Sequence, residues 1–457
     1  MNHSLLCISP IDGRYNNRTN KLSKYFSEKA LITYRLHVEI EYLIYLLDKL
    51  DVDISKDRER FMNFKLCVRN IYKKLKIDNL ENIKEIEKRV NHDVKAIEIY
   101  IRNRLEESKY NKYNEYVHFG LTSQDINSTS YMLSMHDANK EIIIPYLNKL
   151  LNILDKIIIK YQDIPMLSRT HGQPASPTIL GKEINVFTYR LNKQLKLLES
   201  YKYSTKFGGA VGNFNSHQIA YPNIDWSEAA DEFINNFGFE RNKITTQIDI
   251  YDNYSELFDI LRRISIILLD LSRDMWLYIS QDYFKQKCIE DEVGSSTMPH
   301  KINPINFENA EGNLMLVTTL FDFMSQKLPV SRLQRDLSDS TVMRNIGSCY
   351  AYLLISIISL IDGFKRIEPN LGKIKQELND NQIILAEAIQ SILRREGVEN
   401  SYDIIKNITR DKTFSKTEII TIIENNLKKN NKDKIIKEIN NLDVNTYVGI
   451  YKYEKLN

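Results

Sequence analysis

The apolar residues of several long segments recur at steps of three and four residues. Between residues 143 and 161 they fall at Ile143, Leu147, Leu150, Leu154, Ile158 and Tyr161, and residues 254–271 repeat the pattern. This spacing places them on one face of an α-helix. Glycine (15) and proline (10) are scarce in 457 residues, and convincing alternating strands are absent. Long amphipathic helices with few turns predict an all-α fold with a long central helical bundle.

The length of the chain and the positions of its turns predict more than one domain. A chain of 457 residues is too long for a single hydrophobic core. Glycine and proline cluster in a few places, which we interpret as helix ends and loops, where functional residues gather. The apolar pattern is interrupted near residues 112 and 365. We therefore predict three helical domains: residues 1–112, residues 113–364 with the bundle, and residues 365–457.

Charge and cysteine usage exclude several classes of protein. Lys+Arg 63 nearly balances Asp+Glu 60, so no basic face for nucleic acid is expected. The four cysteines are widely spaced and form no CxxC pair, which argues against a metal site or disulfides. The N-terminus does not resemble a signal peptide. The longest apolar run, residues 350–361, is shorter than the about 20 residues that span a bilayer. We expect a cytoplasmic protein without membrane partner, metal or cofactor.

The stretch "VGSSTMPHKINPINFENAEGN", residues 293–313, suits neither a helix nor a packed strand at its start. It is either a connecting loop or a mobile loop that carries catalytic groups. A serine becomes a base or nucleophile only when its ionised form is stabilised. Gly294 lets backbone amides approach closely and Lys301 adds a positive charge, which together can hold an alkoxide or oxyanion. Glu308, on a helix expected to begin after Pro304, could orient a histidine.

Other polar stretches carry further candidates, each with a structural alternative. His171 in "SRTHGQPASP" lies between polar neighbours at the edge of an element, where a histidine can act as acid or base, although most lone histidines are structural. In "HFGLTSQDINSTS", Thr122 or Ser123 is expected to cap a helix whose first turn holds Asp125. Such a helix N-terminus also binds anions. "FGGAVGNFN" lacks the pattern of a phosphate loop and predicts a tight backbone bend.

Six motifs along the chain together resemble one family. "GSSTMPHKINP" resembles the signature of the fumarase/aspartase lyase superfamily. "SPIDGRY", "NHDVKAIE", "HFGLTSQDIN", "RTHGQPASPT" and "LQRDLSDSTVMRNIG" are similar to adenylosuccinate lyases of the longer bacterial-type branch. The resemblance runs from Ser9 to Gly347. It implies an all-helical, three-domain subunit in a homotetramer whose active sites are shared between subunits. It also implies two nucleotide substrates, adenylosuccinate, which gives AMP and fumarate, and succinylaminoimidazole carboxamide ribotide.

The resemblance assigns roles to residues of this chain. Ser295 matches the general base and His171 the general acid, with Glu308 orienting the histidine. Lys301 and Asn303 are candidates for holding the dianionic carboxylate that forms. Arginines are expected to take the phosphate and a carboxylate, and Thr122 and Ser123 the succinyl end. The expected substrate contacts are Arg14, Tyr15, Asn91, His92, Asp93, Thr122, Ser123, Gln247, Ser296, Asn303, Asn309, Arg335, Ser340 and Arg344.

Several alternatives stay open at this point. Asn91 stands where many of these lyases have an arginine, which leaves a phosphate contact there undecided. A carboxymuconate cycloisomerase would keep the fold, but its small substrate has no nucleotide to meet Arg14 and Tyr15. A catalytically silent structural bundle would not need Ser295, His171 and Lys301 together. The sequence decides neither the preferred substrate, nor the role of residues 365–457, nor regulation, nor which subunits form each site.

Overall fold

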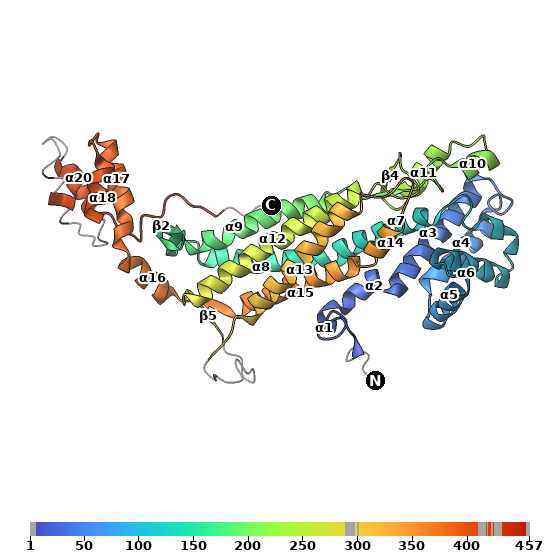
Figure 1. Cartoon of the computed structure of the whole chain (residues 1–457), viewed down its shortest axis with the longest axis horizontal. Coiled ribbons are helices and arrows are strands. Elements are labelled where there is room, and N and C mark those ends of the chain that lie inside the picture. The colour runs from blue at the N-terminus through green and yellow to red at the C-terminus, as the bar shows by residue number, and fades with distance from the viewer. Residues whose placement is uncertain are drawn as a thin grey trace. The chain divides into compact units, whose positions relative to one another are not determined.

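The computed structural model describes residues 6–287, 298, 301–409, 417, 419–421, 424 and 432–453. These residues are mostly helical, which confirms the predicted all-α class (Figure 1). The α-helices are α1 Asn16–Thr19, α2 Ser23–Phe26, α3 Glu28–Lys49, α4 Arg58–Lys73, α5 Ile77–Val90, α6 Asp93–Glu107, α7 Ser123–Ala138, α8 Ile144–Lys160, α9 Leu180–Glu199, α10 Asn215–Ala220, α11 Trp226–Asn235, α12 Asp252–Ser280, α13 Ile305–Lys327, α14 Ser338–Met343, α15 Ile346–Lys365, α16 Leu371–Asp380, α17 Leu385–Arg395, α18 Ser401–Thr409 and α20 Lys432–Asn440.

Shorter elements join these helices. Three are 3₁₀-helices or single turns and one is a π-helix: η2 Asn20–Leu22, η3 Asn111–Tyr116, η5 Gln382–Ile384 and the π-helix η4 Asn139–Ile143. The strands are β1 Pro165–Thr170, β2 Gln173–Ile179, β3 Ser204–Lys206, β4 Glu240–Asn242, β5 Phe284–Gln286 and β6 Ile367–Pro369. They pair as β1–β2 antiparallel, β3–β4 parallel and β5–β6 antiparallel.

The helices with the clearest apolar period occur where the sequence predicts them. The pattern of residues 143–161 corresponds to α8, and that of residues 254–271 lies inside α12. The helix that carries Glu308, α13, begins at Ile305, directly after Pro304. Proline is well suited to the position just before or at the start of a helix, because its missing N–H would lack an intrahelical partner there.

One compact unit consists of Met1–Asn148, Gln194–Ile266 and Ala310–Ile358. In it α3 packs against α4, α6 and α7 (Figure 1). Leu36, Ile40 and Leu47 of α3 are fully buried in a core that α3 shares with α4, α5 and α6. A second contact zone stacks Phe258 on Phe321, with ring centroids 5.7 Å apart. Burial of each such side chain contributes about 1.5–3 kcal/mol relative to its exposure to water.

The second compact unit consists of Lys149–Lys193, Ile267–Asn309 and Ser359–Asn457. Its β1–β2 hairpin packs on α16, and Leu167 of β1 lies in a small core with Leu378 and Leu385. Farther along the chain, α17, α18 and α20 enclose a separate core around Ile389, Ile405 and Ile439.

One helical stretch among the described residues, Ser338–Lys365, is long and apolar enough to cross a membrane by length and composition. Its most apolar window is 72% buried inside the protein. Leu353, Leu354 and Ile357 are fully buried. This burial is typical of a core helix that packs against other helices, so its apolar composition is accounted for within the fold.

Candidate active site

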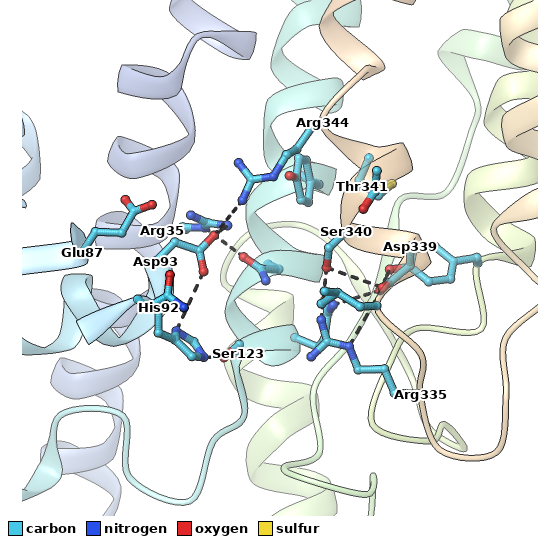
Figure 2. A pocket seen from close by; sticks show the side chains of 17 residues that line it. Arg35, Glu87, His92, Asp93, Ser123, Arg335, Asp339, Ser340, Thr341 and Arg344 are labelled. Carbon is cyan, nitrogen blue, oxygen red and sulfur yellow. Dashed lines mark hydrogen bonds and ion pairs between the residues drawn. The ribbon is translucent and has the colours of Figure 1, made fainter. Parts of the chain in front are cut away.

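The first compact unit contains a cavity of about 400 Å³ in which several of the predicted site residues meet (Figure 2). They come from the start of α6, the start of α7, and α14 with the residues that flank it. Asp93 and Arg344 are 251 positions apart in sequence, yet they form an ion pair here. The predicted residues that line the cavity are Asn91, His92, Asp93, Ser123, Arg335, Ser340 and Arg344.

His92 caps the N-terminus of α6 with its imidazole. Its Nδ1 accepts a hydrogen bond of 3.1 Å from the backbone N–H of Lys95. An accepting Nδ1 carries no proton, so in the neutral ring the proton is on Nε2. Nε2 lies 3.4 Å from the Ser123 hydroxyl and lines the cavity. The cap therefore fixes the tautomer that presents an N–H donor toward a ligand.

Asn91, just before His92, has a left-handed backbone conformation with φ 51°. It ends α5, and its N–H donates to the carbonyl of Glu87 at 2.7 Å. Asparagine is one of the few residues that adopt this conformation at modest cost. The residue thus has a structural reason for its identity in addition to its place on the cavity wall.

Asp93 is held between two arginines at the cavity wall (Figure 2). Its Oδ2 accepts from Arg35 at 2.8 Å and from Arg344 at 3.1 Å, and its Oδ1 accepts from the N–H of Val94 at 2.9 Å. Burial opposes ionisation of the Asp93 carboxyl, but the guanidinium of Arg35, the Val94 amide and Arg344 together hold its pKa below the ordinary value. Asp93 is therefore a carboxylate at neutral pH.

The start of α7, which carries Thr122 and Ser123, is fixed by a buried ion pair. Thr122 is the N-cap and donates its N–H to Asp125 Oδ2 at 2.8 Å, as the sequence led us to expect. Asp125 Oδ1 also accepts from Lys206 Nζ at 2.6 Å and from the N–H of Gly208 at 2.8 Å. Both charged side chains are 0% exposed. The glycine-containing bend at residues 207–213 thus supplies donors to this buried carboxylate.

The turn that leads into α7 is packed against a buried histidine. Gly120 has φ 69°, and a Cβ at this position would lie 2.4 Å from Cε1 of His217. Glycine is therefore required both by the backbone conformation and by the space. His217 Nε2 lies 2.9 Å from the hydroxyl of Tyr42. Burial lowers the pKa of His217 to about 4, although attraction by Asp125 opposes this shift.

The lowered pKa of His217 predicts a loss of stability in mild acid. The unfolded chain protonates this histidine near pH 6.5 and the folded chain near pH 4. Between these values the unfolded state binds more protons, so the free energy of unfolding falls as the pH drops from about 6.5 to about 4. In denaturant titrations at pH 7 and pH 5, His217→Gln is expected to show a smaller decrease than the unsubstituted protein. His171→Gln, a control at an exposed turn, is expected to show the same decrease in the free energy of unfolding as the unsubstituted protein. The same decrease in His217→Gln would contradict the prediction.

On the opposite wall, Arg335 is fixed by uncharged partners. It donates to the Ser340 hydroxyl at 3.1 Å and to Oε1 of Gln247 at 3.4 Å. Nearby Asp339 is buried and accepts from Gln124 and from the hydroxyl of Tyr251, both at 2.9 Å. These contacts bring Gln247 close to the cavity, although it is not among the lining residues. The close contacts of the Arg335 guanidinium are thus with uncharged groups, while its ion pair with Asp339 is long, at 4.0 Å.

Two predicted contacts do not line this cavity, and two others lie outside the described residues. Arg14 and Tyr15 belong to the segment just before α1 and do not line the cavity. A neighbouring cavity of about 320 Å³ is lined by that segment and also by Arg344. Ser295 and Ser296 lie outside the described residues. The role of the loop that carries them stays a prediction.

The remaining predicted residues belong to the second compact unit. His171 lies exposed at the turn between β1 and β2, with φ 52°. Glu308, near the start of α13, accepts a hydrogen bond from the indole of Trp276 at 3.1 Å. Among the described residues no hydrogen bond joins His171 to Glu308. Asn309 accepts from the Ser359 hydroxyl at 2.8 Å, and Lys301 and Asn303 lie just before α13.

Sequence reasoning missed several residues of the cavity, of which Arg35 is the most informative. It is an arginine within the apolar pattern "LITYRLHVEI" and is 2% exposed. A charge in the apolar face of a helix needs a buried partner, and this could have identified Arg35 as a site residue. Further missed residues include polar side chains on α7, α12 and α14 or beside them, without a comparable signal: Gln124, Asn127, Tyr131, Tyr251 and Asp339.

The class of protein follows from fold and family. Residues 13–318 match the family profile described as "Lyase". Among solved structures, a fumarate lyase from Mesorhizobium sp. BNC1 has a TM-score of 0.71 at 16% identity and covers 94% of this chain and 95% of its own. The β-carboxy-cis,cis-muconate cycloisomerase of Acinetobacter calcoaceticus sp. ADP1 has a TM-score of 0.69 at 17% identity, with the same coverage. At these identities the structures share the fold alone, while the profile identifies a lyase.

The particular family follows from closer relatives. Residues 331–448 match the profile "Adenylosuccinate lyase C-terminal". The adenylosuccinate lyase of Dictyostelium discoideum is 44% identical, over 98% of this chain and 97% of its own. That of Escherichia coli (strain K12) is 42% identical, over 90% of each chain. The chain therefore belongs to the adenylosuccinate lyase family, and it is a carbon–nitrogen lyase.

Proposed function

We propose that this chain removes fumarate from adenylosuccinate to give AMP, and from succinylaminoimidazole carboxamide ribotide by the same β-elimination. The observation that carries the proposal is the cavity in which Arg335, Arg344 and the α7 N-terminus converge from two separate family motifs. Both substrates carry a phosphate and two carboxylates. Guanidinium groups bind such anions with paired, charge-assisted hydrogen bonds. The test is the release of fumarate and AMP in equal amounts from adenylosuccinate by the purified protein.

The chemistry that we propose begins at the carbon next to a succinyl carboxylate. Ser295, in its ionised form, takes the proton from this carbon, and the electrons of the broken C–H bond are held on the neighbouring carboxylate as a dianion. These electrons then form the double bond of fumarate as the C–N bond breaks, and His171 protonates the departing nitrogen. The carbon acid is weak, so the dianionic carboxylate formed on the way needs cations and amides, for which Lys301 and Asn303 are the candidates. Glu308 orients the imidazole of His171.

The binding roles rest on the geometry of the first compact unit. The N-terminus of α7 presents backbone N–H groups together with the Ser123 hydroxyl, which suits a succinyl carboxylate. His92 presents its Nε2–H beside Ser123, with a separation of 3.4 Å between Nε2 and Oγ. We assign Arg335 and Arg344 to the phosphate and the second carboxylate. Arg14 and Tyr15 are assigned to the nucleotide from the side of Arg344.

We infer further that complete sites are shared between subunits of a homotetramer. His171 and Glu308 are both exposed and form no hydrogen bond with each other within the described part of one chain. Long helices also expose large apolar side chains, among them Leu316 and Phe323 of α13 and Leu277 of α12. Apolar faces of this kind are suited to packing against the helices of further copies.

Mixing two inactive variants tests the shared site. Ser295→Ala and His171→Ala proteins are each expected to be inactive, and their mixture, after denaturation and refolding together, is expected to regain activity. Random assembly returns both native residues to roughly a quarter of the sites if they come from different subunits. The measurement is fumarate release from adenylosuccinate. A mixture as inactive as its components would contradict the shared site, while each variant refolded alone controls for recovery.

A further inference from the structure

The carboxylate of Asp93 binds two arginines that differ in how firmly they are held. The side chain of Arg35 is 3% exposed and donates from Nε to Asn127 Oδ1 and from a terminal nitrogen to Asp93 Oδ2, both at 2.8 Å. Arg344 is 50% exposed and meets the same oxygen at 3.1 Å. Arg35 thus joins α3 to α6 and α7, whereas Arg344 reaches the cavity from the end of α14 (Figure 2).

We propose that Arg35 is a positioning residue that neutralises Asp93 and thereby leaves Arg344 able to bind an anionic group of the substrate. This inference rests on the proposed function in taking the substrate to be an anion. It assigns no contact between Arg35 and the substrate. Arg35 instead weakens the hold of Asp93 on Arg344, so that a phosphate or carboxylate of the substrate can compete for the same guanidinium.

The charges around the cavity support this assignment. With Arg35 present, one carboxylate is shared by two guanidiniums, so the group of three carries a net positive charge. Without Arg35, Asp93 and Arg344 form a neutral pair, and an incoming anion has to displace the carboxylate from its remaining cation. The attraction between opposite charges at about 3 Å is strong where water is partly excluded. Substrate binding would then weaken while the reacting groups stay unchanged.

Other charged groups that line the cavity do not replace Arg35. Glu87 is itself negative and accepts at 2.6 Å from Lys84, an ammonium that it shares with Glu28. Asp339 is held by Gln124 and Tyr251, and Arg335 faces it from 4.0 Å. His92 meets Asp93 with Nδ1 at 3.9 Å, but this nitrogen accepts from Lys95 and so carries no proton there. The described partners of Asp93 that bring positive charge are therefore Arg35 and Arg344.

The test compares three variants in steady-state kinetics. Arg35→Met is expected to raise KM for adenylosuccinate about 3- to 10-fold, because the Asp93–Arg344 pair is half-exposed and water screens it, with kcat changed by less than about threefold. Arg35→Lys keeps the charge and is expected to recover most of the affinity. In an Asp93→Asn background, Arg35→Met is expected to change KM by no more than about twofold, because the negative charge that Arg35 neutralises is absent. Arg104→Met, outside the cavity, is the control.

Two results would overturn the inference. One is an unchanged KM in folded Arg35→Met protein. The other is an equal rise in KM in the Asp93→Asn background, which would indicate a purely structural role. If Arg35→Met does not fold, the test uses Arg35→Lys alone. A fall in kcat of Arg35→Lys as large as its rise in KM would contradict the proposal. If the unsubstituted protein does not turn over adenylosuccinate, the proposed function fails independently of this inference. The variants are then compared by the Kd for AMP, measured by calorimetry. An unchanged Kd in Arg35→Met would reject the inference.

Discussion

Replacement of Lys206 by methionine is expected to lower the free energy of unfolding by about 3–5 kcal/mol, the usual cost of removing one partner from a buried ion pair. Lys206 and Asp125 are 0% exposed, with Nζ and Oδ1 2.6 Å apart. Methionine fills a similar volume but leaves the Asp125 carboxylate with only backbone N–H donors and no opposite charge. It also leaves the carbonyl of Gly209, which accepts from Nζ at 2.7 Å, without this donor. Guanidinium chloride unfolding followed by circular dichroism measures the change.

Lys243→Met provides a matched control for this prediction. The Lys243 side chain is 70% exposed and its ammonium lies 3.3 Å from Asp231, which also pairs with Arg241. An exposed pair of this kind contributes less than about 1 kcal/mol. A loss in Lys206→Met no larger than in Lys243→Met would show that the buried pair does not stabilise the start of α7. A double variant Lys206→Met/Asp125→Asn is expected to recover part of the loss, because the unpaired charge is removed.

Replacement of Ser295 by alanine is expected to reduce kcat for adenylosuccinate by about 10²- to 10⁴-fold, the contribution of a general base. Alanine removes the hydroxyl oxygen that accepts the proton and changes little else in size. KM is expected to change far less, because the proposed anion contacts lie with Arg335, Arg344 and the α7 N-terminus. Initial rates over a range of substrate concentrations separate the two parameters.

The adjacent serine offers the control for this second prediction. Ser296 is expected to contact the substrate without accepting the proton, so Ser296→Ala should lower kcat/KM by only about tenfold. A larger loss of kcat in Ser296→Ala than in Ser295→Ala would show that Ser296, and not Ser295, is the base. Equal activity of Ser295→Ala and the unsubstituted protein would remove Ser295 from the mechanism.

The helical class was predictable because it depends on local periodicity. The apolar positions of α8 and α12 repeat at the helical period, and the cap at Thr122 is signalled by its own residue type. The β1–β2 hairpin gave no such signal, since its strands contain prolines and polar residues instead of an alternating pattern. Its turn at His171 and Gly172 has positive φ at both positions, a conformation that tight hairpin turns use.

The cavity was predictable only through resemblance to a family. Spacing alone does not bring Asp93 to Arg344 or Lys206 to Asp125, because these pairs are 251 and 81 positions apart. Long-range pairs of this kind depend on how helices pack, which composition and periodicity do not specify. The bend at residues 207–213 illustrates the point. Its glycines indicate a turn, but the carboxylate that their N–H groups bind comes from α7.

The most direct test of the proposed function is turnover by the purified protein. Adenylosuccinate is supplied, its ultraviolet spectrum is followed, and AMP and fumarate are quantified, with Ser295→Ala protein measured in parallel. We expect AMP and fumarate in equal amounts from the unsubstituted protein and a rate at least about 10²-fold lower from the variant. No turnover of adenylosuccinate by folded, unsubstituted protein would contradict the proposal and direct attention to other succinyl or muconate substrates.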